Sequence, residues 1–458
     1  MIPERPTRTA ATDEAVSSVG KAARRRIAIR LLPFLFTLYI VAFLDRMNVS
    51  AAALQMPHDL GFNDKTVGLG AGMFFVGYVV LQIPGALIAE RWSARRWFAG
   101  IMAVWGALTI FMAFIHSAAE FYTVRFLVGA AEAGFFPGVI VYLSHWFRKT
   151  DRAKALAAFY AAMPLSFVVG SPIAGVFLGL SWLGLRGWRW LFILEGVPAI
   201  LLGLIAFFYL TDWPQEAKWL APAEREWIST ALEREKSAKK SVRSYSIWQA
   251  VCHRDVILLT FCYLGAATGN YGIAFWLPTI WKRLSGLSDL TVTLLAALPY
   301  FAGFLTQQLN AWHSDRTQER RWHAAVSVFL SGFWLFFAIS FGSNLALSVL
   351  FFTLVSAAYY AFHPAFWSVP TEFLSESAAA ASIGLINAIG NLGGLIGPFV
   401  LGILATRTHS FTGGLSFLVG SFLLSGILML AVGTGRRKMA PAIAAAPAAG
   451  VSESPAQG

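Results

Sequence analysis

Charged residues are scarce in this sequence of 458 residues: they make up 13%, against about 25% in an ordinary soluble domain. Hydrophobic residues make up 57% and come in long blocks rather than mixed with polar residues. A soluble protein of this composition would expose large apolar patches and aggregate, which argues against a soluble enzyme with an enlarged core. The sequence therefore indicates a protein that crosses a membrane many times.

Cysteine is nearly absent, and metal-site motifs are missing. The two cysteines, Cys252 and Cys262, cannot form a disulfide framework, and neither has the neighbours of a metal site. The sequence also lacks a nucleophile motif and a soluble catalytic domain, so we expect no enzyme activity, no metal and no cofactor. The net charge of +12 comes from short basic clusters between apolar blocks. That pattern sets orientation in a membrane and does not indicate a nucleic-acid partner.

Long apolar blocks are what the sequence has in abundance. A helix needs about 20 apolar residues to cross the hydrocarbon core of a bilayer. Blocks of this length predict an all-α polytopic membrane protein with about twelve transmembrane helices in two six-helix bundles. The predicted spans are 28–53, 66–89, 97–116, 119–143, 153–180, 190–211, 255–281, 289–312, 323–342, 345–370, 380–405 and 412–434.

The remaining segments complete the predicted domain organisation. Basic clusters fall at every second loop and at both ends of the chain, which places both termini in the cytoplasm. Residues 223–240 have the composition of an amphipathic surface helix, and the Ala/Pro/Ser-rich end has that of a disordered tail. The predicted units are a cytoplasmic tail (1–27), a first bundle (28–211), a cytoplasmic linker (212–254), a second bundle (255–434) and a disordered cytoplasmic tail (435–458).

The two halves repeat each other. ALIAERWSARRW follows the second predicted span, and AWHSDRTQERRW follows the eighth. Acid, base and aromatic residues recur in these loops at one offset of 225 residues, as from Glu90 to Asp315 and from Arg91 to Arg316. This repeat predicts two similar bundles related by an axis along the membrane normal. Transporters of this architecture bind their substrate at mid-membrane between the halves.

Four charged residues stand out inside predicted spans of the first half. A charge at the bilayer centre costs about 2.5–3.5 kcal/mol, so it must face a cavity or a partner. Asp45 and Arg46 are adjacent and point about 100° apart on a helix, so each needs its own partner. Arg125 and Glu132 lie two turns apart on one face of another helix. The alternatives are a direct role in transport and permanent salt bridges that hold the bundle together.

The corresponding polar positions of the second half are uncharged. The 225-residue offset leads from Asp45 to Asn270, and Asn387 and Asn391 follow later. We interpret this difference as a division of labour, in which one half couples ions and the other shapes the ligand site. Helix–helix hydrogen bonding is the alternative for each amide. GNLGGLIGPF, which contains Asn391, predicts a closely packed helix rather than a phosphate loop, because no strand precedes it.

Six stretches spread over positions 44–398 carry a family resemblance. They resemble transporters of the major facilitator superfamily. More narrowly they are similar to the anion:cation symporter family, which holds bacterial sugar-acid, tartrate and phthalate permeases and vertebrate sialin-type carriers. The stretches are LDRMNVS, RFLVGAAEAGFFPG, GWRWLFILEG, DWPQEAKWL, FWLPTI and PTEFLSESAAAASIGLINAIGNLGGLIGP.

The resemblance implies roles for the buried polar residues. It implies that Asp45 and Glu132 bind protons, that Arg46 meets a substrate carboxylate, and that Arg125 is the charge partner of Glu132. It places three further residues in the substrate pocket: Tyr78, Trp367 and Asn387.

The loop repeat resembles the gate motif of the superfamily. By this resemblance the gate comprises Glu90, Arg91, Asp315 and Arg316. The sequence departs from the motif because Ala86 and Ala311 stand where it starts with glycine. The charges of the gate are kept, whereas the close helix contact that glycine allows is not expected.

The expected function is secondary transport. The resemblance implies proton-coupled import of a small organic anion (a sugar acid, a tartrate-like acid or an aromatic carboxylate) by alternating access across the inner membrane, by a monomer. An exporter on the same fold, moving an organic acid or drug by proton antiport, is the alternative. A membrane enzyme or sensor is a third hypothesis that no motif supports.

Overall fold

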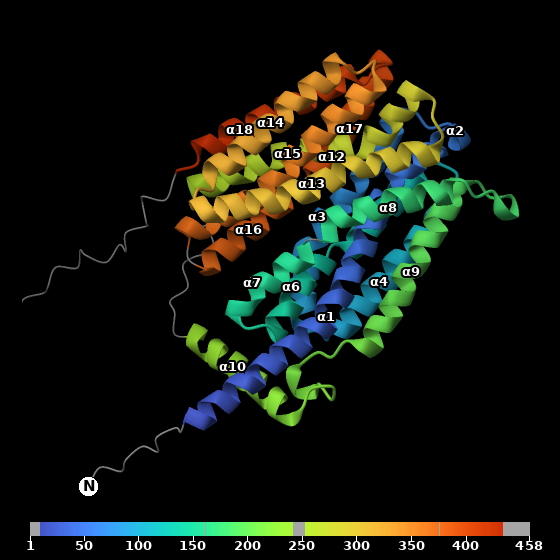
Figure 1. Cartoon of the computed structure of the whole chain (residues 1–458). Helices are drawn as coiled ribbons and strands as arrows, with labels where there is room; N and C mark the ends of the chain where they lie inside the picture. The colour runs from blue at the N-terminus through green and yellow to red at the C-terminus, as the bar shows by residue number, and fades with distance from the viewer. Residues whose placement is uncertain (1–9, 161, 241–251, 375, 434–458) are drawn as a thin grey trace, which may run out of the picture.

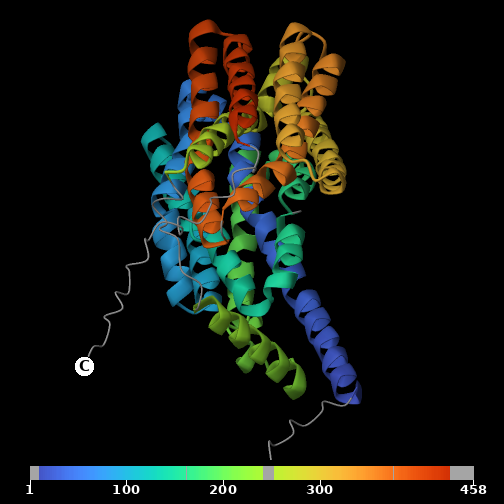
Figure 2. The same ribbon diagram turned by 90° about the vertical axis from the view of Figure 1, so that its left-hand side faces the viewer.

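A computed structural model of the protein describes residues 10–160, 162–240, 252–374 and 376–433. Regular structure in these ranges is entirely helical, which confirms the predicted all-α fold. Figures 1 and 2 show that the helices gather in two groups, one from each half of the chain. The predicted tail 435–458 lies outside the described residues.

The helices of the first half follow one another in short connections. They are α1 (Ala10–Ala52), α2 (Met56–Leu60), α3 (Asp64–Arg91), α4 (Ala94–Met112), α5 (Ala118–Glu132), α6 (Phe135–Trp146), α7 (Lys149–Tyr160), α8 (Ala162–Leu178) and α9 (Gly187–Tyr209). The helix expected over 223–240 is present as α10 (Pro222–Lys240). The second half contains α12 (Arg254–Ser285), α13 (Asp289–Thr317), α14 (Arg321–Ser340), α15 (Leu345–Phe373), α16 (Glu376–Gly390), α17 (Gly393–Thr408) and α18 (Thr412–Ala431).

Length and composition mark many of these helices as membrane spans. Within the described residues, ten helical segments are long and apolar enough to cross a membrane. The predicted spans 97–116 and 153–180 are not among these ten. The first corresponds to α4, which begins with Ala94–Arg95–Arg96, and the second includes α8, an apolar helix of only 17 residues. The protein is therefore a multi-pass membrane protein.

Two predicted spans are each built from two helices. The span 119–143 breaks between α5 and α6, and the span 380–405 breaks between α16 and α17. The GNLGG stretch at the second break packs closely, as the sequence predicts. A Cβ added to Gly393 would lie 2.5 Å from the backbone nitrogen of Thr268, and one added to Gly397 would lie 2.2 Å from the Thr268 carbonyl oxygen. Only glycine allows α17 to approach α12 this closely.

The long first helix defines the two sides of the membrane domain. We call the side on which α1 begins and α10 lies the N-terminal side, and the side on which α1 ends and α2 lies the far side (Figure 1). Arg26 of α1 bonds Glu224 of α10 at 2.8 Å, so α10 packs along the first turns of α1 that precede the predicted span. Because α10 and the first turns of α1 both carry many charged residues, this contact is suited to the membrane surface.

Polar contacts join the two halves on the far side. Arg283 near the end of α12 forms two hydrogen bonds, of 2.8 and 2.5 Å, with Asp64 at the start of α3. Gln55 donates a hydrogen bond of 2.8 Å to Asp289 at the start of α13. We call these two contacts the far-side latch. Bidentate guanidinium–carboxylate pairs fix orientation as well as distance, so the latch holds the halves together on this side.

Candidate substrate site between the two halves

The close packing of α3 on α5 positions the buried charges. Gly77 of α3 lies against the backbone of α5, where an added Cβ would come within 2.1 Å of the Phe126 oxygen. Gly129 of α5 meets α3 in the same way, at 1.9 Å from the Phe74 oxygen. Small residues at such contacts let helix backbones approach. As a result, α5, which carries Arg125 and Glu132, is held close against α3.

Arg46 of α1 pairs with Glu132, the last residue of α5. The two side chains form a buried salt bridge, with Arg46 Nη2 donating to Glu132 Oε1. The Arg46 guanidinium also lies over the rings of Phe43 at 4.6 Å and Tyr78 at 5.0 Å. A charge-assisted hydrogen bond and two cation–π contacts together stabilise a guanidinium away from water.

Asp45 points to a different neighbour, as the helix geometry requires. Its carboxylate is fully buried and accepts a hydrogen bond from Trp105 Nε1 of α4. Asn48 Nδ2, one turn further along α1, donates to Asp45 Oδ1 at 3.3 Å. The adjacent acid and base of α1 therefore serve two separate contacts, one with α4 and one with α5.

Arg125 is buried but does not bond Glu132 directly. Its guanidinium lies over the ring of Phe74 at 4.9 Å, and its Nε has no hydrogen-bond partner. The partner of Glu132 is Arg46, whereas the resemblance implies Arg125. The difference arises because two helical turns separate Arg125 from Glu132, while Arg46 comes from another helix at the level of the carboxylate. The tuning role of Arg125 stays a prediction.

A cavity between the two halves brings the pocket residues together. Arg46 and Tyr78 line it from the first half, and Trp367 of α15 and Asn387 of α16 line it from the second. The cavity has a volume of about 40 Å³, which accommodates water but is small for an organic acid. The site is thus contracted in this structure. It is completed by Tyr39, Phe43, Phe136, Tyr160, Met163, Tyr263, Tyr271, His363 and Asn391.

Sequence reasoning missed much of this aromatic lining. Tyrosines in apolar helices give no pattern that separates a cavity wall from a packed core. His363 of α15 faces the cavity as well, and its Nδ1 lies 3.3 Å from the Tyr359 oxygen. Glu195 of α9 was also missed. It lies in the quoted stretch GWRWLFILEG, and a carboxyl within an apolar span is a signal that could have singled it out.

The predicted gate is described only in the second half. The side chains of Glu90 and Arg91 lie outside the described part of the structure. Asp315 forms a salt bridge of 2.6 Å with Arg320, and Arg316 lies over the ring of Trp312 at 5.6 Å. The gate role of these four residues therefore stays a prediction.

Comparisons with known proteins agree with this architecture. The family profile described as Major Facilitator Superfamily matches residues 35–398. A protein named as a candidate tartrate transporter of Agrobacterium vitis is 45% identical over 408 residues, which cover 89% of this chain and 93% of the relative. A quinolone resistance transporter of Acinetobacter baumannii is 37% identical over 402 residues, which cover 86% of this chain and 91% of the relative.

A solved structure shares the fold. A bacterial homologue of the human lysosomal transporter Spinster, in an inward-facing unoccupied conformation, superposes with a TM-score of 0.70 at 18% identity and covers 89% of this chain and 95% of that one. This likeness shows that the two chains share a fold. Profile, relatives and fold lead to one conclusion: this chain belongs to the Major Facilitator Superfamily and is a membrane transporter of a small molecule.

Proposed function

We propose that this transporter imports a small organic anion together with protons across the inner membrane, by alternating access. The observation that carries the proposal is the buried Arg46–Glu132 pair at the wall of a cavity between the halves. Guanidinium is the group that binds a carboxylate in bidentate fashion, and a buried carboxyl is the group that binds a proton. The tartrate-transporter name of one relative supports an organic acid as cargo.

The pair supports a mechanism of exchange. While Glu132 is ionised it occupies the Arg46 guanidinium, so a substrate carboxylate must compete with it. Protonation of Glu132 removes its negative charge and frees Arg46 for the substrate. Each state then keeps the guanidinium paired, because an unpaired buried charge costs several kcal/mol. Asp45, hydrogen-bonded to Trp105, is the second proton-binding carboxyl of the proposal. Tyr78, Trp367 and Asn387 contact the rest of the anion.

A proton gradient can drive accumulation in this scheme. One proton moving through 100 mV contributes about 2.3 kcal/mol, which supports a gradient of about 50-fold. Proteoliposomes with an imposed pH gradient test this with a panel of organic acids that begins with tartrate. We expect uptake of one acid to rise with the gradient. If uptake of every acid ignores the gradient, proton coupling is wrong.

Glu132→Gln tests the role of the carboxyl. The amide keeps the shape of the side chain but binds no proton, so we expect counterflow exchange to remain and gradient-driven accumulation to be lost. Loss of both activities would instead indicate a structural bridge. Glu226→Gln is the matched control, because Glu226 is an exposed carboxyl on α10 far from the cavity. It should transport like the unmodified protein.

Export of an organic acid or drug by proton antiport is the second candidate. The quinolone resistance transporter among the relatives favours it. The buried arginines argue against hydrophobic cations as cargo but are compatible with an acid. Everted vesicles with an acidic interior distinguish the two directions. A proton-coupled importer would carry cargo out of these vesicles, whereas a proton antiporter that exports would carry cargo into them. The proposal also includes a monomer with both termini in the cytoplasm.

A further inference from the structure

A third buried carboxyl lies in the membrane domain and is not used by the mechanism above. Glu195 of α9 is only 5% exposed and lies nine residues into a helix of 23 residues. No cationic side chain among the described residues forms a salt bridge with it, and its Oε2 has no hydrogen-bond partner. An ionised carboxylate without a cation costs several kcal/mol in such surroundings.

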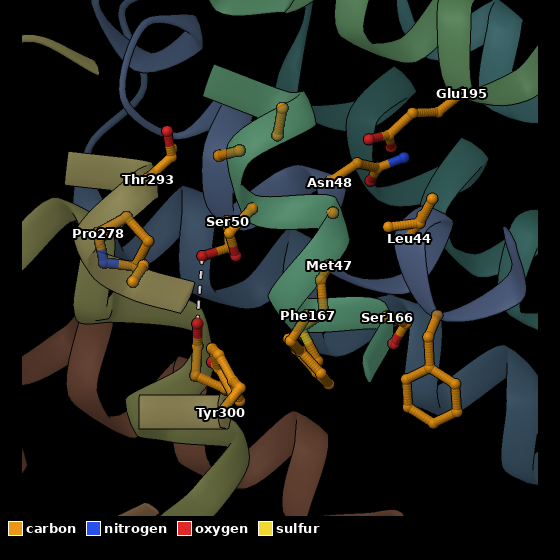
Figure 3. A pocket seen from close by; sticks show the side chains of 17 residues that line it. Leu44, Met47, Asn48, Ser50, Ser166, Phe167, Glu195, Pro278, Thr293 and Tyr300 are labelled. Carbon is orange, nitrogen blue, oxygen red and sulfur yellow. Dashed lines mark hydrogen bonds between the residues drawn. The ribbon is translucent and has the colours of Figure 1, made fainter. Parts of the chain in front are cut away.

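Glu195 lines a pocket that is separate from the substrate cavity. The pocket, shown in Figure 3, has a volume of about 40 Å³, enough for water. Its walls come from the far-side ends of helices: Ser50 is near the end of α1, Ala174 near the end of α8 and Thr293 near the start of α13. Phe43 lines both this pocket and the substrate cavity and stands between them. We call this space the far-side pocket.

Asn48 connects Glu195 to Asp45. Its Nδ2 donates to Asp45 Oδ1 at 3.3 Å, and the same amide lies against the Glu195 carboxylate (Figure 3). An amide group has two N–H donors, so one Asn48 side chain serves both acids. The Asn48 oxygen has no partner, which leaves it free to accept a proton-bearing Glu195 hydroxyl.

The count of buried charges favours a bound proton at Glu195. Among the buried groups of the described residues, Asp45, Glu132 and Glu195 are opposed by two guanidiniums, those of Arg46 and Arg125. Arg46 is taken by Glu132. With all three acids ionised this region would carry a net negative charge in a low dielectric, and an anionic substrate would add to it. A proton on Glu195 removes that excess.

The groups around Glu195 offer no other source of positive charge. Among the residues lining the far-side pocket, α8 contributes serines and apolar side chains, and α13 contributes Tyr300 as its titratable group. From α12 the lining includes Ala274 and Pro278. Asp45 of α1 is the charged group that acts on Glu195, and α4 packs on α9 through Gly106. A proton from water is therefore the means of neutralising Glu195.

We propose that Glu195 is a third proton-binding carboxyl of this transporter, that it shares the Asn48 amide with Asp45, and that its proton comes from water in the far-side pocket. The two acids then hold one negative charge between them, and the route of the proton is distinct from that of the substrate. Proton binding at Glu195 does not depend on the proposed function, whereas its contribution to coupled uptake rests on it.

Infrared pH-difference spectra of the purified full-length protein test proton binding directly. We expect a protonated carboxyl band that titrates outside the range of exposed carboxyl groups and disappears in Glu195→Gln. Glu226→Gln is the control and should change the spectrum only in the pH range where exposed carboxyl groups titrate. If the spectrum of Glu195→Gln keeps every carboxyl band that titrates outside the range of exposed groups, the proposal is overturned.

Two more variants test the shared amide. When Asn48 is present, Asp45→Asn should change the titration of the Glu195 band, because the two acids are coupled. With Asn48→Ala the Glu195 band should persist, but Asp45→Asn should no longer alter its titration to the same extent. An unchanged coupling in the Asn48→Ala background would overturn the shared-amide part. These variants keep the Glu195 carboxyl, so they remain informative if Glu195→Gln fails to fold.

Transport in proteoliposomes with tartrate as the probe tests the role in coupling. Glu195→Gln should keep counterflow, while accumulation at 100 mV falls by up to about 50-fold, the share of one proton. An equal loss of counterflow and accumulation would indicate a structural carboxyl and overturn the coupling role. If the unmodified protein itself ignores the pH gradient, the proposed function fails, and the infrared band still decides whether Glu195 binds a proton.

Discussion

At the scale of single residues, the membrane domain concentrates its charge on a few buried contacts. Arg46 and Glu132 form an ion pair, and Asp45 takes hydrogen bonds from Trp105 and Asn48. The same low dielectric that makes each contact strong makes each group costly to leave alone. These residues therefore carry stability and transport together, and the two roles have to be separated by experiment.

A double-mutant cycle on the ion pair separates them. Arg46→Ala leaves Glu132 buried without its partner, so we expect the folded state to lose about 3–5 kcal/mol. The double variant Arg46→Ala/Glu132→Gln removes both charges and should recover most of that loss, while transport stays abolished. Thermal unfolding in detergent, beside an uptake assay, measures both. A double variant no more stable than Arg46→Ala would contradict the buried pair.

The limits of sequence reasoning at this scale follow from the geometry. Asp45, Arg46, Arg125 and Glu132 stand out because charge is rare in apolar spans, and their 100° and two-turn relations follow from helix geometry. Which acid meets which base depends on how α1 and α5 are rotated and shifted against each other. That choice is made by packing between helices distant in sequence, such as Gly129 on Phe74, and cannot be derived from spacing along one helix.

At the scale of elements, the spans could be located from the sequence because crossing a bilayer fixes a length and a composition. The breaks within the spans could not be located from the sequence in the same way. The helix break between Glu132 and Phe135 follows from local packing around Gly134, where an added Cβ would meet Trp97 at 2.4 Å. Such contacts join segments far apart in the chain. The helix starts, in contrast, depend on local capping that the sequence contains, and α14 illustrates this.

The start of α14 is held by Glu319. Its carboxylate accepts hydrogen bonds from the backbone N–H groups of Trp322 at 2.8 Å and His323 at 3.2 Å. Glu319→Ala leaves these donors unpaired and should cost about 1 kcal/mol, the usual value of a cap. We expect the amides of this first turn to exchange about five times faster, as measured by hydrogen–deuterium exchange. Glu319→Gln keeps an acceptor oxygen and should exchange more slowly than Glu319→Ala.

The pH dependence of this cap has a defined sign. Burial raises the pKa of Glu319, but the hydrogen bonds from Trp322 and His323 outweigh it and hold the pKa below the usual value of glutamate. The stabilisation is therefore complete above the ordinary glutamate pKa and is lost as pH falls through the lowered value. Amide protection at Trp322 should persist at mildly acidic pH. Loss of protection at pH 6 would contradict this interpretation.

At the scale of the whole molecule, the far-side latch holds the two halves in this arrangement. Arg283 is about half exposed, so its pair with Asp64 contributes no more than about 1 kcal/mol. Asp64→Asn should shift the population toward opening on the far side by up to about fivefold. Spin labels at Ser181→Cys and Ser416→Cys, both on the far side of their halves, report the distance with Cys252 replaced by serine.

The latch also supplies its own control. Asp289→Ala removes the carboxylate that accepts the hydrogen bond from Gln55 at 2.8 Å, so it should act in the same direction as Asp64→Asn. The two contacts lie in different helix pairs, and their effects should add. Asp151→Asn removes a carboxyl on the N-terminal side and should leave the far-side distance distribution unchanged. A distribution that neither latch variant moves would show that apolar packing alone closes this side.

The orientation of the protein in the membrane can be read from its own cysteines. Cys252 is exposed just before α12 begins, on the N-terminal side, and Cys262 is buried within α12. If basic residues set the orientation, this side is cytoplasmic. A membrane-impermeant maleimide should then label Cys252 in inside-out vesicles and not in right-side-out vesicles, with Cys252→Ser as the blank. Ser181→Cys in that blank should show the reverse pattern, since Ser181 lies in the connection between α8 and α9 on the far side. Labelling of Cys252 from the outside would reverse the assignment of both termini, and with it the side from which Glu195 receives its proton.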